Sequence, residues 1–475
     1  MELNSRTRSL GIALAVAPVT AVVCTAASWI RLYLTGTLEL QPGLAMTWTS
    51  GSASAALAVL GACCIVAYRN VEKDDLDRVL KCSLVIHGCL LLAIPLQDAD
   101  FFVYLGHGAL VAHGFNPHLV GAAALGNSPF MTLSPWKDTP SPYGPVATFI
   151  TAIGGVLGKW TNSPIWVSGV AYKLIAGSLD LWSLFVASAV SRNAATTGAA
   201  RGFAAFALNP LLAWAVAAQA HNDGLIILSS LIFLWALQRD RDVVAAVALT
   251  LGTMTKFVLG PLLALYLLIV CLHSMRRALL LAALSTALCC ALLWPWWPGV
   301  HALLSFSQPV GLPVNTIHSA ASIHWVIFKL QQKAHISDHA MWRTYQLWTQ
   351  LGWGSVLALF LVLTWRASRD TLAHVFAIVL LSIIATVAWL MNWYFLWPLP
   401  FAIVEAGRRW QRLVLGTTVV AALASGPGRL VLIQPPVQLV VVVALLGWRA
   451  WSLDRAGTQT VGAPNEADQM FGRTA

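Results

Sequence analysis

Apolar segments long enough to cross a lipid bilayer recur along almost the whole chain, and they limit its fold more than any other feature. A membrane-spanning helix needs about 20 mostly apolar residues. The candidate spans are residues 9–30, 51–68, 82–96, 143–160, 165–190, 203–218, 222–238, 243–255 with 258–272, 278–298, 347–366, 371–391, 394–407, 411–425 and 429–448. Charged residues make up only 10% of the 475-residue chain, against about 25% in soluble domains. The sequence therefore predicts an all-α polytopic membrane protein of roughly 11–14 transmembrane helices, some of them short and broken.

The net charge of +10 is carried largely by short loops between these spans, which is the pattern that orients membrane proteins and does not indicate nucleic-acid binding. Basic residues mark the loops at 69–81, 239–241, 276–277, 366–369, 408–412 and 449–455 as cytoplasmic. The loops at 97–142 and 299–346 and the short turn at 391–394 are then expected on the non-cytoplasmic face. We expect a multi-pass plasma-membrane protein with one integral domain over 1–455 and a polar cytoplasmic tail over 456–475.

Two segments do not fit a simple series of crossings. Four candidate spans lie between the outer loop at 97–142 and the inner loop at 239–241, although an odd number is required. We infer that 143–160 or a neighbour does not fully cross, and that it lines a water-filled cavity. The segment 243–272 has arginines at both ends and Lys256 near its middle, which predicts two half-length helices that meet at Lys256. The alternative for Lys256 is an ammonium that extends to the membrane interface.

Polar groups expected on the outer face form four sets. Asp98 and Asp100 follow an apolar span directly, where an unpaired carboxylate costs several kcal/mol. The sets are Asp98 and Asp100 with Tyr104, His107 and Asn116; His221, Asn222 and Asp223; Lys256; and His318 and His324 with Trp393 and Tyr394. Each set also has an ordinary interpretation, such as a solvated loop acid or, for Asn222 and Asp223, a helix N-cap.

Five motifs resemble the polyprenol-phosphate-dependent glycosyltransferases of the multi-spanning GT-C fold, and their mannosyltransferase branch most closely. Residues 100–118 read DFFVYLGHGALVAHGFNPH, and 141–145 read SPYGP, which is similar to the Tyr-Pro-Pro element of that group. The others are His221-Asn222-Asp223, the Lys256 break with Pro261, and 392–398, which read NWYFLWP. They occur in the expected order between about residues 98 and 400. Val103, His107 and Ala109 depart from the pattern, and Gly144 separates Tyr143 from the second proline.

The resemblance implies a GT-C-like bundle that transfers one sugar, expected to be mannose, from a polyprenyl-phosphate donor to a hydroxyl of a glycan or glycolipid acceptor in cell-envelope glycan biosynthesis. The transfer inverts the anomeric centre on the non-cytoplasmic face. In that group an aspartate of the first outer loop is the catalytic base, and it corresponds here to Asp100, with Asp98 as the other candidate. Lys256, assisted by His318 or His324, is expected to stabilise the leaving phosphate, and His221, Asn222 and Asp223 to orient donor or acceptor. Tyr104, His107, Asn116, Tyr143, Trp393 and Tyr394 are expected to line the substrate cavity.

Two alternative classes of protein stay open beside the enzyme. Broken helices and intramembrane charge are also typical of a transporter or flippase of lipid-linked saccharides. A non-catalytic membrane scaffold is a third class, although it would not require reactive groups in five separate segments. No cofactor is expected; Asp98, Asp100 and Asp223 are the residues that would gather a divalent metal, which we do not favour.

Overall fold

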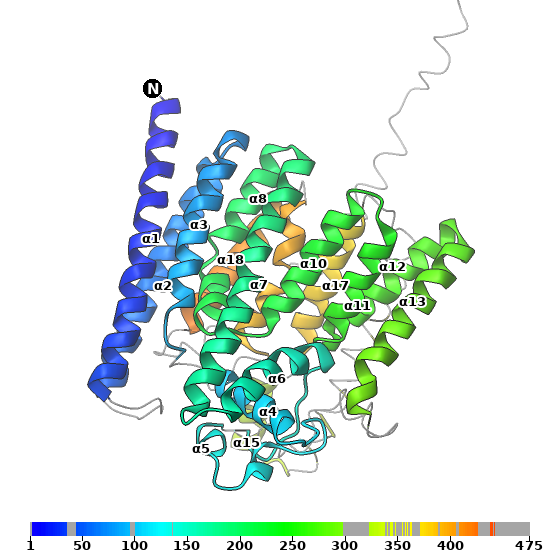
Figure 1. Cartoon of the computed structure of the whole chain (residues 1–475). Helices are drawn as coiled ribbons and strands as arrows, with labels where there is room; N and C mark the ends of the chain where they lie inside the picture. The colour runs from blue at the N-terminus through cyan, green and yellow to red at the C-terminus, as the bar shows by residue number, and fades with distance from the viewer. Residues whose placement is uncertain are drawn as a thin grey trace, which may run out of the picture.

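The computed structural model describes residues 2–35, 44–95, 100–134, 136–297, 323–337, 371–387, 390–404 and 408–425, with isolated positions in 340–362 and 438–441. These residues form helices and turns without a strand, which confirms the predicted all-α class. The first part of the chain folds into four helices that lie side by side (Figure 1). They are α1 (Glu2–Thr35), α2 (Leu44–Asn70), α3 (Leu76–Leu91) and α7 (Pro164–Ala194).

The second part of the chain uses shorter helices. In order these are α8 (Thr197–Ala207), α9 (Pro210–Leu212), the π-helix η3 (Ala213–Ala218), α10 (Asp223–Leu237), α11 (Asp242–Thr253), η4 (Phe257–Leu259), α12 (Gly260–His273), α13 (Met275–Leu293), η5 (Trp294–Trp296), α15 (Ile323–Lys333), α17 (Leu372–Thr386), η7 (Asn392–Leu396), η8 (Leu399–Ile403) and α18 (Arg408–Ser425). Within the described residues, five helical segments are long and apolar enough to cross a bilayer, and seven shorter apolar helices accompany them. The chain is thus a polytopic membrane protein whose lower half contains many interrupted helices.

The segment between α3 and α7 explains why the sequence contains an even number of candidate spans where an odd number is required. It contains α4 (Asp100–Ala112), η2 (Ala122–Leu125), α5 (Pro129–Leu133) and α6 (Pro145–Lys159), which lie together at the lower end in Figure 1. Helix α6 lies at this end beside α4. The helices α7 and α10 and the α8–η3 segment extend along the bundle, which fits the odd number of crossings required. Glycines permit the close approach of α4 and α6: a Cβ at Gly108 would lie 2.1 Å from the carbonyl oxygen of Thr151.

One predicted span is wrong. Residues 394–407 do not form a continuous α-helix; two short 3₁₀ segments, η7 and η8, occupy most of this range. Pro398 and Pro400 lack the backbone N–H groups that an α-helix would use, so the chain turns instead. The predicted spans 347–366 and 429–448 and the tail at 456–475 lie mostly or entirely outside the described residues.

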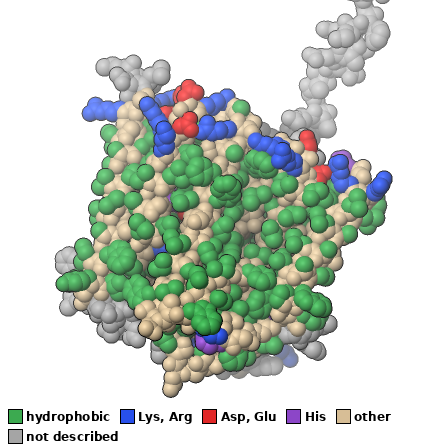
Figure 2. Space-filling view, in the orientation of Figure 1, with side chains coloured by type: hydrophobic (Ala, Val, Ile, Leu, Met, Phe, Trp, Pro, Cys, Tyr) green, Lys and Arg blue, Asp and Glu red, His purple; other side chains and the backbone are tan. Residues whose placement is uncertain are grey.

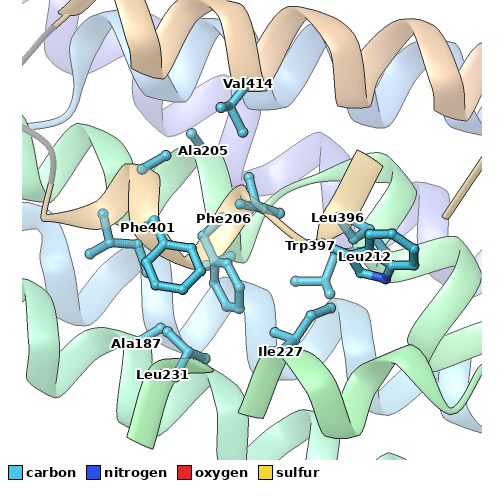
Figure 3. Packing of buried hydrophobic residues seen from close by; sticks show 14 of the residues in the cluster. Ala187, Ala205, Phe206, Leu212, Ile227, Leu231, Leu396, Trp397, Phe401 and Val414 are labelled. Carbon is cyan, nitrogen blue, oxygen red and sulfur yellow. The ribbon is translucent and has the colours of Figure 1, made fainter. Parts of the chain in front are cut away.

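The interior of the bundle is a tightly packed apolar core. Figure 3 shows Phe206 of α8 beside Phe401 of η8, with Leu231 of α10 and Val414 of α18 nearby. The Phe233 and Phe376 rings stack 5.0 Å apart. Because lipid tails are as apolar as these side chains, close van der Waals packing and not water exclusion holds such helices together.

Charged side chains mark one end of the molecule. Figure 2 shows most of the visible lysines and arginines at the upper end, where α1 begins. The connections α2–α3 and α10–α11 and the first turn of α13 lie at this end. They carry Lys73, Arg239, Arg241, Arg276 and Arg277. Helices α4, α5 and α6 lie at the opposite end.

Candidate functional site

An ion pair between Lys256 and Asp223 is the centre of the candidate site. The Lys256 Nζ lies 3.2 Å from both carboxylate oxygens of Asp223, and the Trp397 indole N–H donates to Oδ1 at 2.6 Å. The Asp223 side chain is fully buried, whereas 17% of the Lys256 side chain is exposed. Asp223 therefore has its charge compensated inside the protein, and Lys256 keeps part of its surface available to a ligand.

The helix break that the sequence predicts at Lys256 is confirmed. Helix α11 ends at Thr253, α12 begins at Gly260, and Lys256 itself is extended (φ −158°, ψ 130°). The turn before α6 closes on this break, because the backbone N–H of Gly144 donates to the carbonyl of Thr255 at 2.9 Å. A Cβ at position 144 would lie 2.1 Å from the carbonyl oxygen of Met254, so only glycine fits there. The glycine that interrupts the Tyr-Pro-Pro-like element is thus what lets Tyr143 approach Lys256.

Three aromatic rings surround the Lys256 ammonium. Its Nζ lies 4.6 Å from the ring centre of Tyr394, 5.5 Å from that of Trp397 and 5.7 Å from that of Tyr143. Tyr394 and Trp397 stack on each other with ring centres 4.2 Å apart. Aromatic faces stabilise a cation without neutralising it. The arrangement therefore holds a partly dehydrated positive charge in one place.

His221 connects the site to α4 and to η7. Its Nδ1 lies 3.2 Å from the hydroxyl of Tyr104, and its ring stacks on Trp393 at 3.8 Å. Tyr104 in turn packs edge-on against Tyr143, with ring centres 5.3 Å apart. Residues that are more than 200 positions apart in the sequence thus meet around the His221-Asn222-Asp223 turn.

Asp100, the first residue of α4, belongs to the same cluster. Burial and then the negative charge of Asp100 raise the pKa of Tyr143 well above its ordinary value. Burial, followed by the charges of Asp223 and Asp100, likewise raises the pKa of Tyr394. The two carboxylates therefore act on the same tyrosines that surround Lys256.

The other predicted site residues lie apart from the ion pair or outside the described part. Asn116 donates to the carbonyl of Trp296 at 2.8 Å and joins the α4–α5 segment to η5, and the His107 ring centre lies 6.5 Å from that of Tyr143. Asp98, His318 and the side chain of His324 lie outside the described residues. Among the side chains that are described, no group of three or more His, Cys, Asp or Glu is placed to hold a metal ion. The expectation of a metal-free site stays a prediction.

Three residues with structural roles at the site were not assigned roles from the sequence. Trp397 binds Asp223, and the Tyr172 hydroxyl donates to the carbonyl of Ala220 at 3.0 Å. Lys173 donates to the carbonyls of Ala93 and Ala218, which lie shortly before Asp100 and His221. The only sequence signal for Lys173 was a lysine in the middle of the apolar run 165–190, which calls for an internal partner.

Comparisons with known proteins place the chain in a family. Residues 8–273, more than half of the chain, match the sequence model of the family described as α-(1→6)-mannopyranosyltransferase, N-terminal domain. The chain is 27% identical over 344 residues to α-(1→6)-mannopyranosyltransferase A of Mycobacterium tuberculosis, covering 66% of this chain and 62% of that protein. It is 30% identical over 146 residues to α-(1→6)-mannopyranosyltransferase B of Corynebacterium glutamicum, covering 29% of this chain and 23% of that protein.

These matches leave parts of the relatives uncovered, since the chain spans less than two thirds of their length. No solved structure matches the chain. The family match nevertheless extends over α1 to α12 and includes Asp100, His221, Asp223 and Lys256. The chain belongs to the α-(1→6)-mannopyranosyltransferase family.

Proposed function

We propose that the chain transfers one mannosyl group from a polyprenyl-phosphate donor to a hydroxyl of a glycan or glycolipid acceptor, with inversion at the anomeric carbon. The observation that carries the proposal is the convergence of Asp100 with the Asp223–Lys256 pair and its aromatic rings. Family membership supports mannose as the sugar. Relatives are named for an α-(1→6) product, and inversion to an α product requires a donor whose mannose is β-linked to phosphate.

Each side chain has a defined part in this reaction. Asp100 accepts the proton of the acceptor hydroxyl as the oxygen attacks the anomeric carbon from the side opposite the phosphate. Lys256 stabilises the negative charge that develops on the leaving phosphate, in a setting of low polarity where such an interaction is strong. Asp223 is already bound to Lys256 and Trp397, which supports assigning it to the placement of Lys256.

We further propose that the site works on the non-cytoplasmic side of the plasma membrane. Basic residues gather at the end of the bundle opposite α4 and α6, and lysine and arginine are enriched on the cytoplasmic side. Cysteines introduced at the exposed Asp138 and Asp74 mark the two ends. A membrane-impermeant thiol reagent should label Asp138→Cys in intact cells and Asp74→Cys only after permeabilisation. The reverse pattern would contradict this orientation.

Transfer is tested with purified protein and a panel of donors. The panel contains polyprenyl-phosphate mannose, glucose and arabinose together with a nucleotide-linked mannose, and product linkage is read by NMR. We expect an α-linked mannosyl product from the polyprenyl-phosphate mannose alone. A flippase would move the intact lipid-linked sugar between leaflets of a vesicle without forming a new glycosidic bond, and that result would replace the proposal.

A further inference from the structure

The turn at residues 219–222 has an unusual backbone. It follows the π-helix η3, and Ala220 has a φ of 57°, in the left-handed region that side chains rarely adopt. The Tyr172 hydroxyl binds the Ala220 carbonyl and holds this conformation. Strained backbone of this kind persists only where surrounding contacts maintain it, and it concentrates at ligand sites.

Asn222, in this turn, has a buried amide without a hydrogen-bond partner among the described residues. The residue is 4% exposed, and neither Nδ2 nor Oδ1 bonds to any part of the chain that the structure describes. It occupies the N-cap position of α10, but its side chain accepts no N–H of that helix, so a side-chain cap does not explain this residue. Gln219 adds a second buried acceptor, because its Oε1 also has no partner within the described ranges. Leaving such groups unsatisfied costs free energy, and this cost indicates a ligand that supplies the missing bonds.

Asn209, the residue directly before α9, provides the internal comparison. It is equally buried and also begins a helix, yet its Oδ1 accepts from the N–H groups of Leu211 and Leu212. Its Nδ2 donates to the Ala205 carbonyl and to the Thr418 hydroxyl. The fold is thus able to satisfy the hydrogen bonds of a buried asparagine, whereas the described residues leave both amide atoms of Asn222 without a bond.

The chemistry of the unused atoms selects the kind of ligand. A phosphate offers only acceptors and cannot satisfy the Asn222 Oδ1 or the Gln219 Oε1. A pair of adjacent sugar hydroxyls donates and accepts at once, as the amide requires. The neighbouring Asp223–Lys256 pair provides the cation for the phosphate of the same donor.

We propose that Asn222 binds two adjacent hydroxyls of the donor mannosyl group, with Gln219 accepting from one of them, and that this contact selects the sugar. The proposal rests on the proposed function.

Donor analogues lacking the 2-, 3- or 4-hydroxyl test the contact with Asn222. Wild-type kcat/KM should fall at least about a hundredfold for one adjacent pair of positions, because a site built to bind a hydroxyl rejects its absence. In Asn222→Ala, kcat/KM for the natural donor should fall by a similar factor. Removal of either of these two hydroxyls from the donor should then lower kcat/KM of the variant by no more than threefold.

Thermal unfolding separates a ligand contact from a structural role. Asn222→Ala removes two unsatisfied atoms and should melt at or above the wild-type temperature, whereas the matched variant Asn209→Ala should melt lower by about 2 °C or more. Polyprenyl-phosphate mannose should raise the melting temperature of the wild type more than that of Asn222→Ala.

The outcomes distinguish the two levels of proposal. Equal hydroxyl penalties in wild type and Asn222→Ala, or a loss of stability in Asn222→Ala like that of Asn209→Ala, would overturn the role of Asn222. Suppose that the donor raises the melting temperature of the wild type more than that of Asn222→Ala, but that the wild type transfers no mannose. This result would contradict the proposed function and leave the Asn222 contact supported.

Discussion

The described part of this bundle contains two buried pairs of an acid with a basic side chain, and they differ in their surroundings. His87 of α3 and Asp180 of α7 are 2.6 Å apart with side chains 0% and 2% exposed, enclosed between two helices. The Lys256–Asp223 pair joins the α11–α12 break to the start of α10, and rings from the α5–α6 turn and from 392–397 surround its partly exposed lysine. Burial of a charge is common to both. What marks the second pair as a site is that segments distant in sequence converge on a cation that still has exposed surface.

Replacement of Lys256 should lower activity much more than replacement of the enclosed His87–Asp180 pair. In Lys256→Met, the leaving phosphate loses its cation, and transfer should fall about 10²- to 10³-fold, as when one transition-state donor is removed. Asp223 is left buried without a counter-charge and keeps, among the described residues, only the Trp397 indole, which should cost about 3–5 kcal/mol of stability. Initial rates and thermal unfolding in detergent measure the two effects.

The double variant Lys256→Met with Asp223→Leu should recover the stability and stay inactive. Lys81→Met, which alters an exposed lysine on the basic end, serves as the control. Recovery of transfer in the double variant would remove Lys256 from the mechanism.

The same design applied to the enclosed pair should change stability alone. His87→Leu or Asp180→Leu should each cost about 3–5 kcal/mol, because each leaves a buried polar partner behind, and the double replacement should recover most of it. Transfer by the double variant should stay within threefold of wild type. Among the described residues, His87 Nε2 and Asp180 Oδ1 have no hydrogen-bond partner. Loss of activity in the stable double variant would therefore show that this pair too takes part in function.

A smaller effect concerns acid sensitivity at the site end. His118 lies in the α4–α5 connection, and burial lowers its pKa from 6.5 to about 4. The unfolded chain therefore binds a proton that the folded protein does not, between about pH 6.5 and pH 4, so stability falls as pH falls through this range. The loss attributable to His118 should reach at most about 3 kcal/mol at pH 4.

Unfolding of His118→Gln against pH checks this value. The variant should show a correspondingly shallower decline between pH 6.5 and pH 4. A slope equal to that of the wild type would assign the acid sensitivity to groups other than this histidine.

The sequence predicted those parts of the structure that depend on local composition. Length and hydrophobicity were enough for the all-α membrane class, and flanking arginines around Lys256 were enough for the helix break. The odd number of crossings pointed to a segment such as α6 that stays at one end of the bundle.

Pairings over long sequence distances could not be predicted in the same way. Asp223 and Trp397 are 174 positions apart, and no periodicity relates them. Asn209 and Asn222 are similar in sequence, since each precedes a helix in an apolar region. The N–H groups of α9 and neighbours from α8 and α18 satisfy the first, and no sequence pattern predicts this difference. Asn116 was expected to line the cavity, which stays a prediction; its hydrogen bond to the carbonyl of Trp296, 180 positions away, could not be predicted.

The most direct test of the account is mannosyl transfer by purified Asp100→Asn. This change keeps the shape of the side chain and removes its ability to accept a proton, so transfer from polyprenyl-phosphate mannose should fall about 10²- to 10⁴-fold. The matched control is Asp77→Asn, which alters an exposed aspartate paired with Arg192 at the start of α3 and should stay within twofold of wild type. Folding of both variants is checked by thermal unfolding. Transfer by a folded Asp100→Asn at the wild-type rate would contradict the assignment of Asp100 as the base.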